Sequence, residues 1–245
     1  MLRLIIILLF LLIFFILSLP VLLIFKLLYK RYPAQIDRLS LSIVQTAFKV
    51  ITFFAGTELI VRGEENVPTD KAVMYVGNHT SFFDIVLTYA RVPALTGFVS
   101  KISVSKVPVL NLWMQRVHCL FLDRENVKEG LKTILAAIEK VKSGISIFIF
   151  PEGTRNKTPD QLLDFKEGSF KIAEKSGCPI VPVTLVNASD ILEDHFPFVK
   201  KTTVVLEYGT PIDMKSLSKD EKKRIGAYVQ GLIQETYRKN KAEFF

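Results

Sequence analysis

The chain has 245 residues, which is enough for one mid-sized domain and a small appendage. Apolar residues make up 49% of it, and 32 Lys and Arg against 24 Asp and Glu give a formal net charge of +8. A basic surface suits anionic partners such as phospholipid headgroups, nucleic acid or phosphorylated substrates. The two cysteines, Cys119 and Cys178, lie in or beside apolar runs without the neighbours of a metal-ligand set. This pattern excludes a cysteine-based metal site and predicts small core residues in a reducing compartment.

The N-terminal segment is almost wholly apolar from Leu4 to Phe25. About 20 such residues are enough to cross a bilayer. A cleaved signal peptide is the competing interpretation, but the run is too long and no small-residue cleavage pattern follows it. The basic residues Lys26, Lys30 and Arg31 come next. This cluster predicts a retained membrane helix with the rest of the chain on the cytoplasmic side.

Residues 37–54 form a second helical pattern. Its apolar stripe contains Leu39, Ile43, Ala47, Val50 and Phe54, and Leu41, Val44, Phe48 and Ile51 widen it. The segment is either an amphipathic helix in the membrane interface or a core-facing helix of the following domain, and the preceding membrane segment favours the interface. With a kink at Pro20, the two helices would also make a hairpin that dips into one leaflet. We therefore predict a membrane anchor over residues 1–56 and a second domain over residues 57–245.

Short apolar runs alternate with longer amphipathic ones from residue 57 onward. The strand candidates are Leu59–Arg62, Ala72–Val76, Gly97–Ser100, Cys119–Leu122, Ile145–Phe150, Ile180–Val186 and Thr203–Tyr208. Strand–helix alternation of this kind predicts an α/β domain with a partly parallel sheet flanked by helices.

Helix start and stop signals occur between these strands. Asn126 and Glu129 form a capping pair for a helix that ends at Gly144, and a short helix should end at Gly177. A capping pair at Ser218 predicts a final long helix from Lys222 to about Lys239.

Polar residues follow four of the predicted strands. They are Asn78 and His79, then Lys101, then Asp123 and Arg124, then the run Pro151 to Arg155. In open α/β sheets, ligands bind outside the carboxyl ends of the strands. If the four strands are parallel, these residues meet at one edge and form a site with one imidazole and several cations.

The spacing of His79 and Asp84 limits how they can pair. Residues five apart on one helix point about 140° away from each other, at roughly 100° per residue. The two can meet if His79 lies in a loop and Asp84 in the first helical turn, with Ser81 at the N-cap. The carboxylate would then fix the imidazole tautomer, and the free nitrogen would deprotonate a hydroxyl that attacks an acyl carbonyl. The alternative is a helix-capping aspartate beside a loop histidine without a catalytic role.

No other residue offers a nucleophile or base of this kind. His118 and His195 have no evident partner in the sequence, and we interpret both as structural. A Gly-x-Ser-x-Gly motif is absent from the sequence. The chemistry predicted is therefore direct transfer without a covalent acyl-enzyme.

The cations supply a candidate anion site. Arg124 and Arg155 can each hold a phosphate through paired donors, and Lys101 can add a point charge. Gly153 would let backbone N–H groups approach an anion or an oxyanion closely. Glu152 would orient Arg155, meet a substrate hydroxyl, or have a purely structural role. The alternative for each cation is a solvated surface charge.

Four short motifs resemble the conserved blocks of the glycerolipid acyltransferases. In chain order they are Asn78-His79-Thr80-Ser81-Phe82-Phe83-Asp84, Phe121-Leu122-Asp123-Arg124, Phe150-Pro151-Glu152-Gly153-Thr154-Arg155 and Ile180-Val181-Pro182-Val183. Each block is short, but four in the family's order are specific. The similarity covers about residues 57 to 210 and implies the bacterial-type 1-acylglycerol-3-phosphate acyltransferases.

This resemblance implies His79 as general base and Asp84 as its orienting partner. Substrate binding is implied for Lys101, Arg124, Glu152, Gly153, Thr154 and Arg155. The implied donor is acyl-CoA or acyl-carrier protein, the acceptor is a lysophospholipid, and no metal or other cofactor is expected. The implied product is phosphatidic acid. The expected location is the cytoplasmic membrane, with membrane lipids around the anchor and the active site facing the cytoplasm.

Two departures from the family pattern bear on specificity. The family often has glycine shortly before its second block, where this chain has His118 and Cys119, and also where Asn111 stands. The alternatives are an acyltransferase for another lysophospholipid or lyso-aminolipid, and a non-catalytic membrane lipid-binding protein. Nucleic acid is not an expected partner, because the cations are not concentrated in one helix or stripe.

Overall fold

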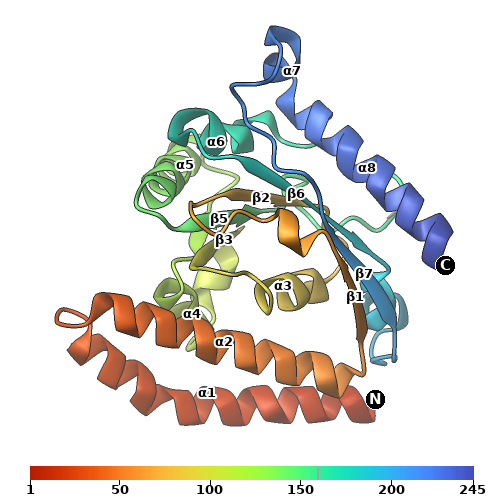
Figure 1. Cartoon of the computed structure of the whole chain (residues 1–245). Helices are drawn as coiled ribbons and strands as arrows, with labels where there is room; N and C mark the ends of the chain where they lie inside the picture. The colour runs from red at the N-terminus through yellow and green to blue at the C-terminus, as the bar shows by residue number, and fades with distance from the viewer. Residues whose placement is uncertain (159) are drawn as a thin grey trace.

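The computed structural model describes residues 1–158 and 160–245, and its centre is a seven-stranded sheet (Figure 1). The strands are β1 (Glu58–Arg62), β2 (Met74–Gly77), β3 (Thr96–Lys101), β4 (Leu120–Leu122), β5 (Ser146–Ile149), β6 (Ile180–Val186) and β7 (Thr203–Tyr208). Their order across the sheet is β1-β7-β6-β2-β5-β3-β4. All seven predicted strands are present, with ends that differ by a few residues.

Helices cover both faces of the sheet. They are α1 (Leu2–Leu28), α2 (Pro33–Ala55), α3 (Phe82–Tyr89), α4 (Leu110–Arg116), α5 (Val127–Lys142), α6 (Lys171–Ser176), α7 (Lys219–Lys223) and α8 (Ile225–Phe244). One face carries α3 and α4 with the α1–α2 hairpin beneath them, and the other carries α5, α6 and α8 (Figure 1). Short 3-10 helices are η1 (Glu64–Asn66), η2 (Ile102–Lys106), η3 (Glu167–Phe170), η4 (Ala188–Ile191) and η5 (Glu193–His195). The predicted α/β class is confirmed.

The four strands that precede the polar motifs all run in the same direction. β2, β5, β3 and β4 are adjacent, and each neighbouring pair is parallel. β6 also pairs parallel with β2, whereas β6 and β7 are antiparallel. The carboxyl ends of β2 to β5 therefore lie at one edge of the sheet, as the sequence predicted.

Successive side chains along the central strands point to opposite faces of the sheet and pack into two separate apolar cores. Tyr75 and Phe148 stack with ring centroids 5.6 Å apart in the core on the α1–α4 side. Their neighbours Met74 and Ile147 point to the opposite core, which α5, α6 and α8 cover. Because both faces are covered, β2 and β5 are buried along their whole length and read as continuous apolar runs.

The α1–α2 hairpin is joined to the rest of the fold by buried contacts. The indole N–H of Trp113 in α4 donates to Ser18 Oγ in α1 at 2.9 Å, and the Phe14 ring lies against the indole. By length and composition, α1 and α2 are each long and apolar enough to cross a membrane. Exposed leucines and isoleucines cover much of α1, for example Leu12 and Leu17.

The buried face of α2 covers part of the predicted stripe. The buried apolar residues of α2 are Ile36, Leu41, Val44, Ala47, Ile51 and Ala55. Of the predicted stripe, Leu41, Val44, Ala47 and Ile51 are buried, while Leu39 is 52% exposed. The core-facing alternative thus describes one face of α2, because that face packs on α1, α3 and α4. Phe53, 78% exposed, shows that the opposite face carries apolar residues too.

The C-terminal helix was predicted as one element and is two. Ser218 and Glu221 form the predicted capping box, but it starts the short helix α7. The backbone leaves helical geometry at Arg224, with φ −123° and ψ 41°. The amide of Gly226 then donates to both carboxylate oxygens of Glu167 at 3.1 Å. This contact with a distant segment redirects the chain, and local capping signals could not reveal it.

No partner for His118 was evident from the sequence, and the structure shows two. Its Nε2 lies 3.0 Å from Asp37 Oδ2 in α2, and its Nδ1 lies 3.3 Å from Lys140 Nζ in α5. Burial lowers the pKa of His118, and this effect exceeds the opposing hydrogen bond to Asp37. His118 also has φ +62°, in the left-handed region that glycine adopts without strain. A glycine is expected here from the resemblance, and the φ value explains why.

We predict that His118→Gly is more stable than His118→Ala. Both variants lose the contacts to Asp37 and Lys140, but only glycine removes the left-handed penalty of about 1–2 kcal/mol. That gain exceeds the roughly 0.4–1 kcal/mol that glycine costs through the unfolded chain. Thermal unfolding in detergent measures the difference, and equal stability of the two variants would contradict it.

The lowered pKa of His118 gives the native protein a further pH signature. The unfolded chain binds this proton more readily than the folded chain, so stability falls as pH drops below about 6.5. His118→Gly and His118→Ala lack this imidazole, so each should lose less stability than the native protein as pH falls below about 6.5.

Candidate active site

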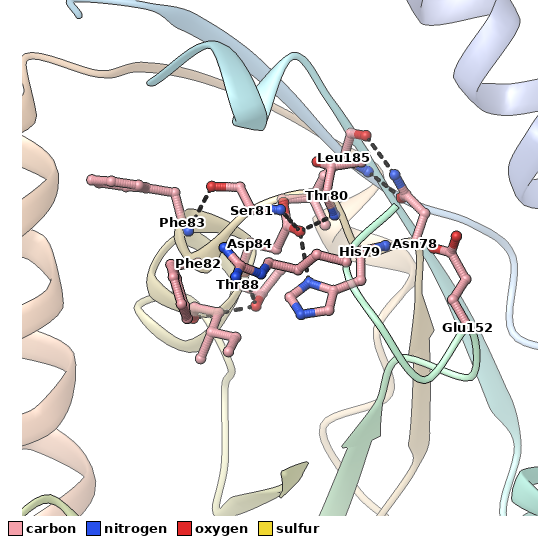
Figure 2. A network of polar contacts seen from close by, with 12 residues as sticks. Asn78, His79, Thr80, Ser81, Phe82, Phe83, Asp84, Thr88, Glu152 and Leu185 are labelled. Carbon is pink, nitrogen blue, oxygen red and sulfur yellow. Dashed lines mark hydrogen bonds and ion pairs between the residues drawn. The ribbon is translucent and has the colours of Figure 1, made fainter. Parts of the chain in front are cut away.

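The candidate site begins where β2 ends, and Asn78 fixes this point. Its side chain donates to the Leu185 carbonyl at 2.9 Å and accepts from the Leu185 amide at 2.8 Å. Figure 2 shows both bonds joining Asn78 to Leu185 in β6. A fully buried side chain with both polar groups paired holds the loop after β2 in one place.

His79 and Asp84 meet in the way that their spacing required. Ser81 is the N-cap of α3 and Asp84 is its third residue, so the loop turns back over the first helical turn. Asp84 Oδ2 lies 2.9 Å from His79 Nδ1 (Figure 2). The same oxygen accepts the backbone N–H of Thr80 at 2.6 Å and of Ser81 at 2.7 Å. Asp84 is fully buried, and these donors hold its carboxylate in a fixed position.

The second imidazole nitrogen faces away from Asp84. The His79 ring stacks on Phe150 with centroids 4.3 Å apart, and its side chain is 15% exposed. Among the residues that the structure describes, none is hydrogen-bonded to His79 Nε2. The arrangement can therefore supply a base. Asp84 fixes the tautomer through Nδ1, and Nε2 is left available to accept a proton.

Glu152 holds the backbone of His79 by a hydrogen bond. One carboxylate oxygen accepts the His79 N–H at 2.7 Å, and the other accepts the Leu163 N–H at 3.0 Å. Burial raises the pKa of Glu152, and the two N–H donors oppose that shift. Of the three roles left open by the sequence, these contacts match the structural one. Arg155 forms its salt bridge with Glu193 and not with Glu152.

The predicted cations lie at the same edge of the sheet. Lys101 ends β3, and its register partner Leu122 in β4 stands two residues before Arg124. Gly153 has φ +76°, and a side chain there would lie within 3.8 Å of the Arg124 guanidinium. Burial lowers the pKa of Arg124. Lys101 and Thr154 are exposed, so both are accessible to a ligand.

Arg155 has partners on two sides. Its Nη1 donates to Glu193 Oε1 at 3.1 Å, and its guanidinium carbon lies 3.9 Å from the Phe82 ring centroid. Phe82 is the first residue of α3, two residues before Asp84. Arg155 thus lies over the start of the helix that carries the aspartate.

Sequence reasoning missed Glu193. Its carboxylate accepts from Ser81 Oγ at 2.6 Å and from the Phe82 N–H at 2.8 Å, in addition to Arg155. Glu193 is 112 residues from Ser81 in the chain and belongs to no motif that carries a chemical signature. The neighbouring His195, for which no partner was expected, lies 2.5 Å from Asp190. Neither contact had a signal in the sequence.

The described residues contain no group of three or more His, Cys, Asp or Glu side chains placed to hold a metal ion. The polar groups of the site are instead one imidazole, the carboxylates of Asp84, Glu152 and Glu193, a set of cations and a glycine-containing loop.

Comparison with known proteins places this arrangement in a family. Residues 58–186 match the model of the acyltransferase family. The chain belongs to this family.

Individual relatives are named for one reaction. A 1-acyl-sn-glycerol-3-phosphate acyltransferase of Borreliella burgdorferi is 32% identical over 196 residues, which cover 80% of this chain and 78% of the relative. An enzyme of the same name from Haemophilus influenzae is 30% identical, with 70% and 72% covered. The crystal structure of the 1-acyl-sn-glycerophosphate acyltransferase PlsC from Thermotoga maritima superposes with a TM-score of 0.73 at 26% identity, covering 90% and 93%.

We predict that Glu152→Gln lowers stability and kcat but not acceptor affinity. The amide has one oxygen for two N–H donors, so one buried N–H loses its partner at a cost of about 1–3 kcal/mol. Displacement of the His79 backbone should lower kcat, while KM for the acceptor stays close to the native value. Glu129→Gln is the control, because exposed Glu129 pairs with exposed Lys132 and loss of this surface ion pair should cost little. A higher KM with unchanged stability would favour the substrate-binding role instead.

Proposed function

We propose that this chain transfers a fatty acyl group from acyl-CoA or acyl-carrier protein to the sn-2 hydroxyl of 1-acylglycerol-3-phosphate, giving phosphatidic acid. The observation that carries the proposal is the contact between His79 Nδ1 and the buried Asp84 carboxylate, at the sheet edge where the predicted cations also follow their strands. The names of the relatives agree with this reaction.

The base acts on the acceptor hydroxyl. His79 Nε2 takes the hydroxyl proton while the alkoxide oxygen bonds to the thioester carbonyl carbon. The resulting oxyanion collapses, the carbon–sulfur bond breaks, and the thiol leaves with the proton from His79. Asp84 stabilises the imidazolium that exists between these two proton transfers. Both proposed donors present the same thioester carbonyl to this base.

The cations bind the acceptor phosphate in this proposal. A phosphate monoester carries up to two negative charges, and Arg155 and Arg124 offer forked donors that match its oxygens. Lys101, exposed at the end of β3, adds a third positive charge. The backbone at Gly153 can approach the substrate closely, because glycine has no side chain and adopts φ +76° without strain. Binding energy at the phosphate thus positions the sn-2 hydroxyl near His79.

The α1–α2 hairpin would bring the enzyme to its lipid acceptor. A lysophospholipid resides in the bilayer, and the exposed apolar surface of α1 is suited to the same environment. We place the protein on the cytoplasmic membrane, with Lys26, Lys30 and Arg31 and the active site on the cytoplasmic side. The acceptor then moves laterally from the bilayer onto the basic edge, while the thioester donor arrives from the cytoplasm.

Acyl transfer to 1-acylglycerol-3-phosphate by membranes that contain the protein tests the reaction. His79→Ala should lower kcat by about 10²–10⁴, since a general base contributes that much. Asp84→Asn should lose a comparable factor, because the asparagine removes the charge that stabilises the imidazolium. Arg155→Ala should mainly raise KM for the acceptor, by about tenfold or more, through loss of a charged hydrogen bond.

Arg91→Ala is the matched control for Arg155→Ala. Arg91 also pairs with a glutamate, Glu64, but it lies beyond the opposite end of α3. Its removal should leave both kinetic constants near the native values. Native protein that transfers nothing to 1-acylglycerol-3-phosphate would refute the acceptor assignment, and full activity of His79→Ala would refute the mechanism.

The membrane role predicts that removal of the hairpin matters more for bilayer substrate than for dispersed substrate. A chain that starts at Thr57 should lose most activity on vesicle-embedded lysolipid. The truncation removes α2 and exposes the core residues that α2 covers, so the thermal unfolding of the truncated chain is measured first. Undiminished rates on both substrates would contradict lateral delivery.

A further inference from the structure

Glu193 connects three separate parts of the site through one carboxylate. It lies in η5, beyond the residues 58–186 that match the family model. Oε2 accepts from Ser81 Oγ, and Oε1 accepts from both the Phe82 N–H and Arg155 Nη1. Its side chain is 19% exposed, so these contacts are partly shielded from water. The carboxylate therefore links the start of α3 to the loop that carries Arg155.

The geometry leaves Arg155 able to bind a second anion. A guanidinium has five N–H donors, and the contact to Glu193 uses one nitrogen, Nη1. One face of the guanidinium lies over the Phe82 ring, which restricts its rotation. The side chain of Arg155 is still 39% exposed, so its other donors are accessible. A guanidinium held by one nitrogen and one face has a fixed direction for its remaining donors.

We infer that Glu193 is a positioning residue that aims Arg155 at the acceptor phosphate. The inference rests on the proposed function, because it assigns a task to Arg155 within that site. A long arginine side chain that is already ordered loses less conformational entropy when it binds phosphate. Glu193 also fixes Arg155 relative to α3, and hence relative to Asp84 and His79. The phosphate-binding group and the base then keep a constant separation.

Glu193→Gln separates this role from a purely structural one. The variant keeps the size of the side chain, and its amide can still accept from the Phe82 N–H and contact Ser81 Oγ. What it loses is the negative charge that holds Arg155. We expect KM for 1-acylglycerol-3-phosphate to rise about tenfold, with kcat within about twofold and thermal stability nearly unchanged.

The double variant with Arg155→Ala completes the test. If Glu193 acts through Arg155, Glu193→Gln should add no further rise in KM once Arg155 is gone. Glu64→Gln is the matched control, since Glu64 holds Arg91 beyond the other end of α3. It should leave KM unchanged.

Three outcomes would overturn the inference while the proposed function stands. In the first, KM of Glu193→Gln equals the native value. In the second, KM falls, because repulsion between Glu193 and the phosphate dominates in the native protein. In the third, Glu193→Gln still raises KM in the Arg155→Ala background. Native protein that fails to acylate 1-acylglycerol-3-phosphate would instead refute the proposed function, and the inference with it.

Discussion

The Asp84 carboxylate is the point on which the geometry of the site depends. It is fully buried, and its Oδ2 accepts two backbone N–H groups as well as facing the imidazole. The same contacts that start α3 therefore also orient His79. Capping of α3 and orientation of the His79 imidazole therefore depend on one carboxylate oxygen.

The sheet determines what surrounds this pair. Parallel β2, β5, β3 and β4 direct their following loops to one edge of the sheet, and His79, Lys101, Arg124 and Arg155 all lie at the ends of these strands or in these loops. Glu152 lies in the loop after β5 and Glu193 lies in η5 after β6, and each holds one component of the site. Glu152 supports the backbone of His79, whereas Glu193 holds Arg155. Two carboxylates thus fix two functional groups independently.

The predictable parts of the molecule are those encoded by short-range patterns. Strand periodicity located the sheet, and the Ser81–Asp84 capping pattern predicted how His79 and Asp84 would meet. Contacts over long sequence separations had no such pattern. Glu167 accepts from the first turn of α8 over 59 residues, and Glu193 accepts from Ser81 over 112 residues. The face of α2 that is buried was also ambiguous, because apolar residues occur all around that helix and only packing on α1, α3 and α4 selects one side.

The contact between Trp113 and α1 has a practical consequence. Trp113 is the one tryptophan in the sequence. Its buried indole donates to Ser18 and lies against Phe14, both of which belong to the N-terminal helix. Separation of α1 from α4 would expose the indole to water or lipid and remove its hydrogen bond. The intrinsic fluorescence of the native chain is therefore an internal reporter of hairpin docking, readable in vesicles without any added label.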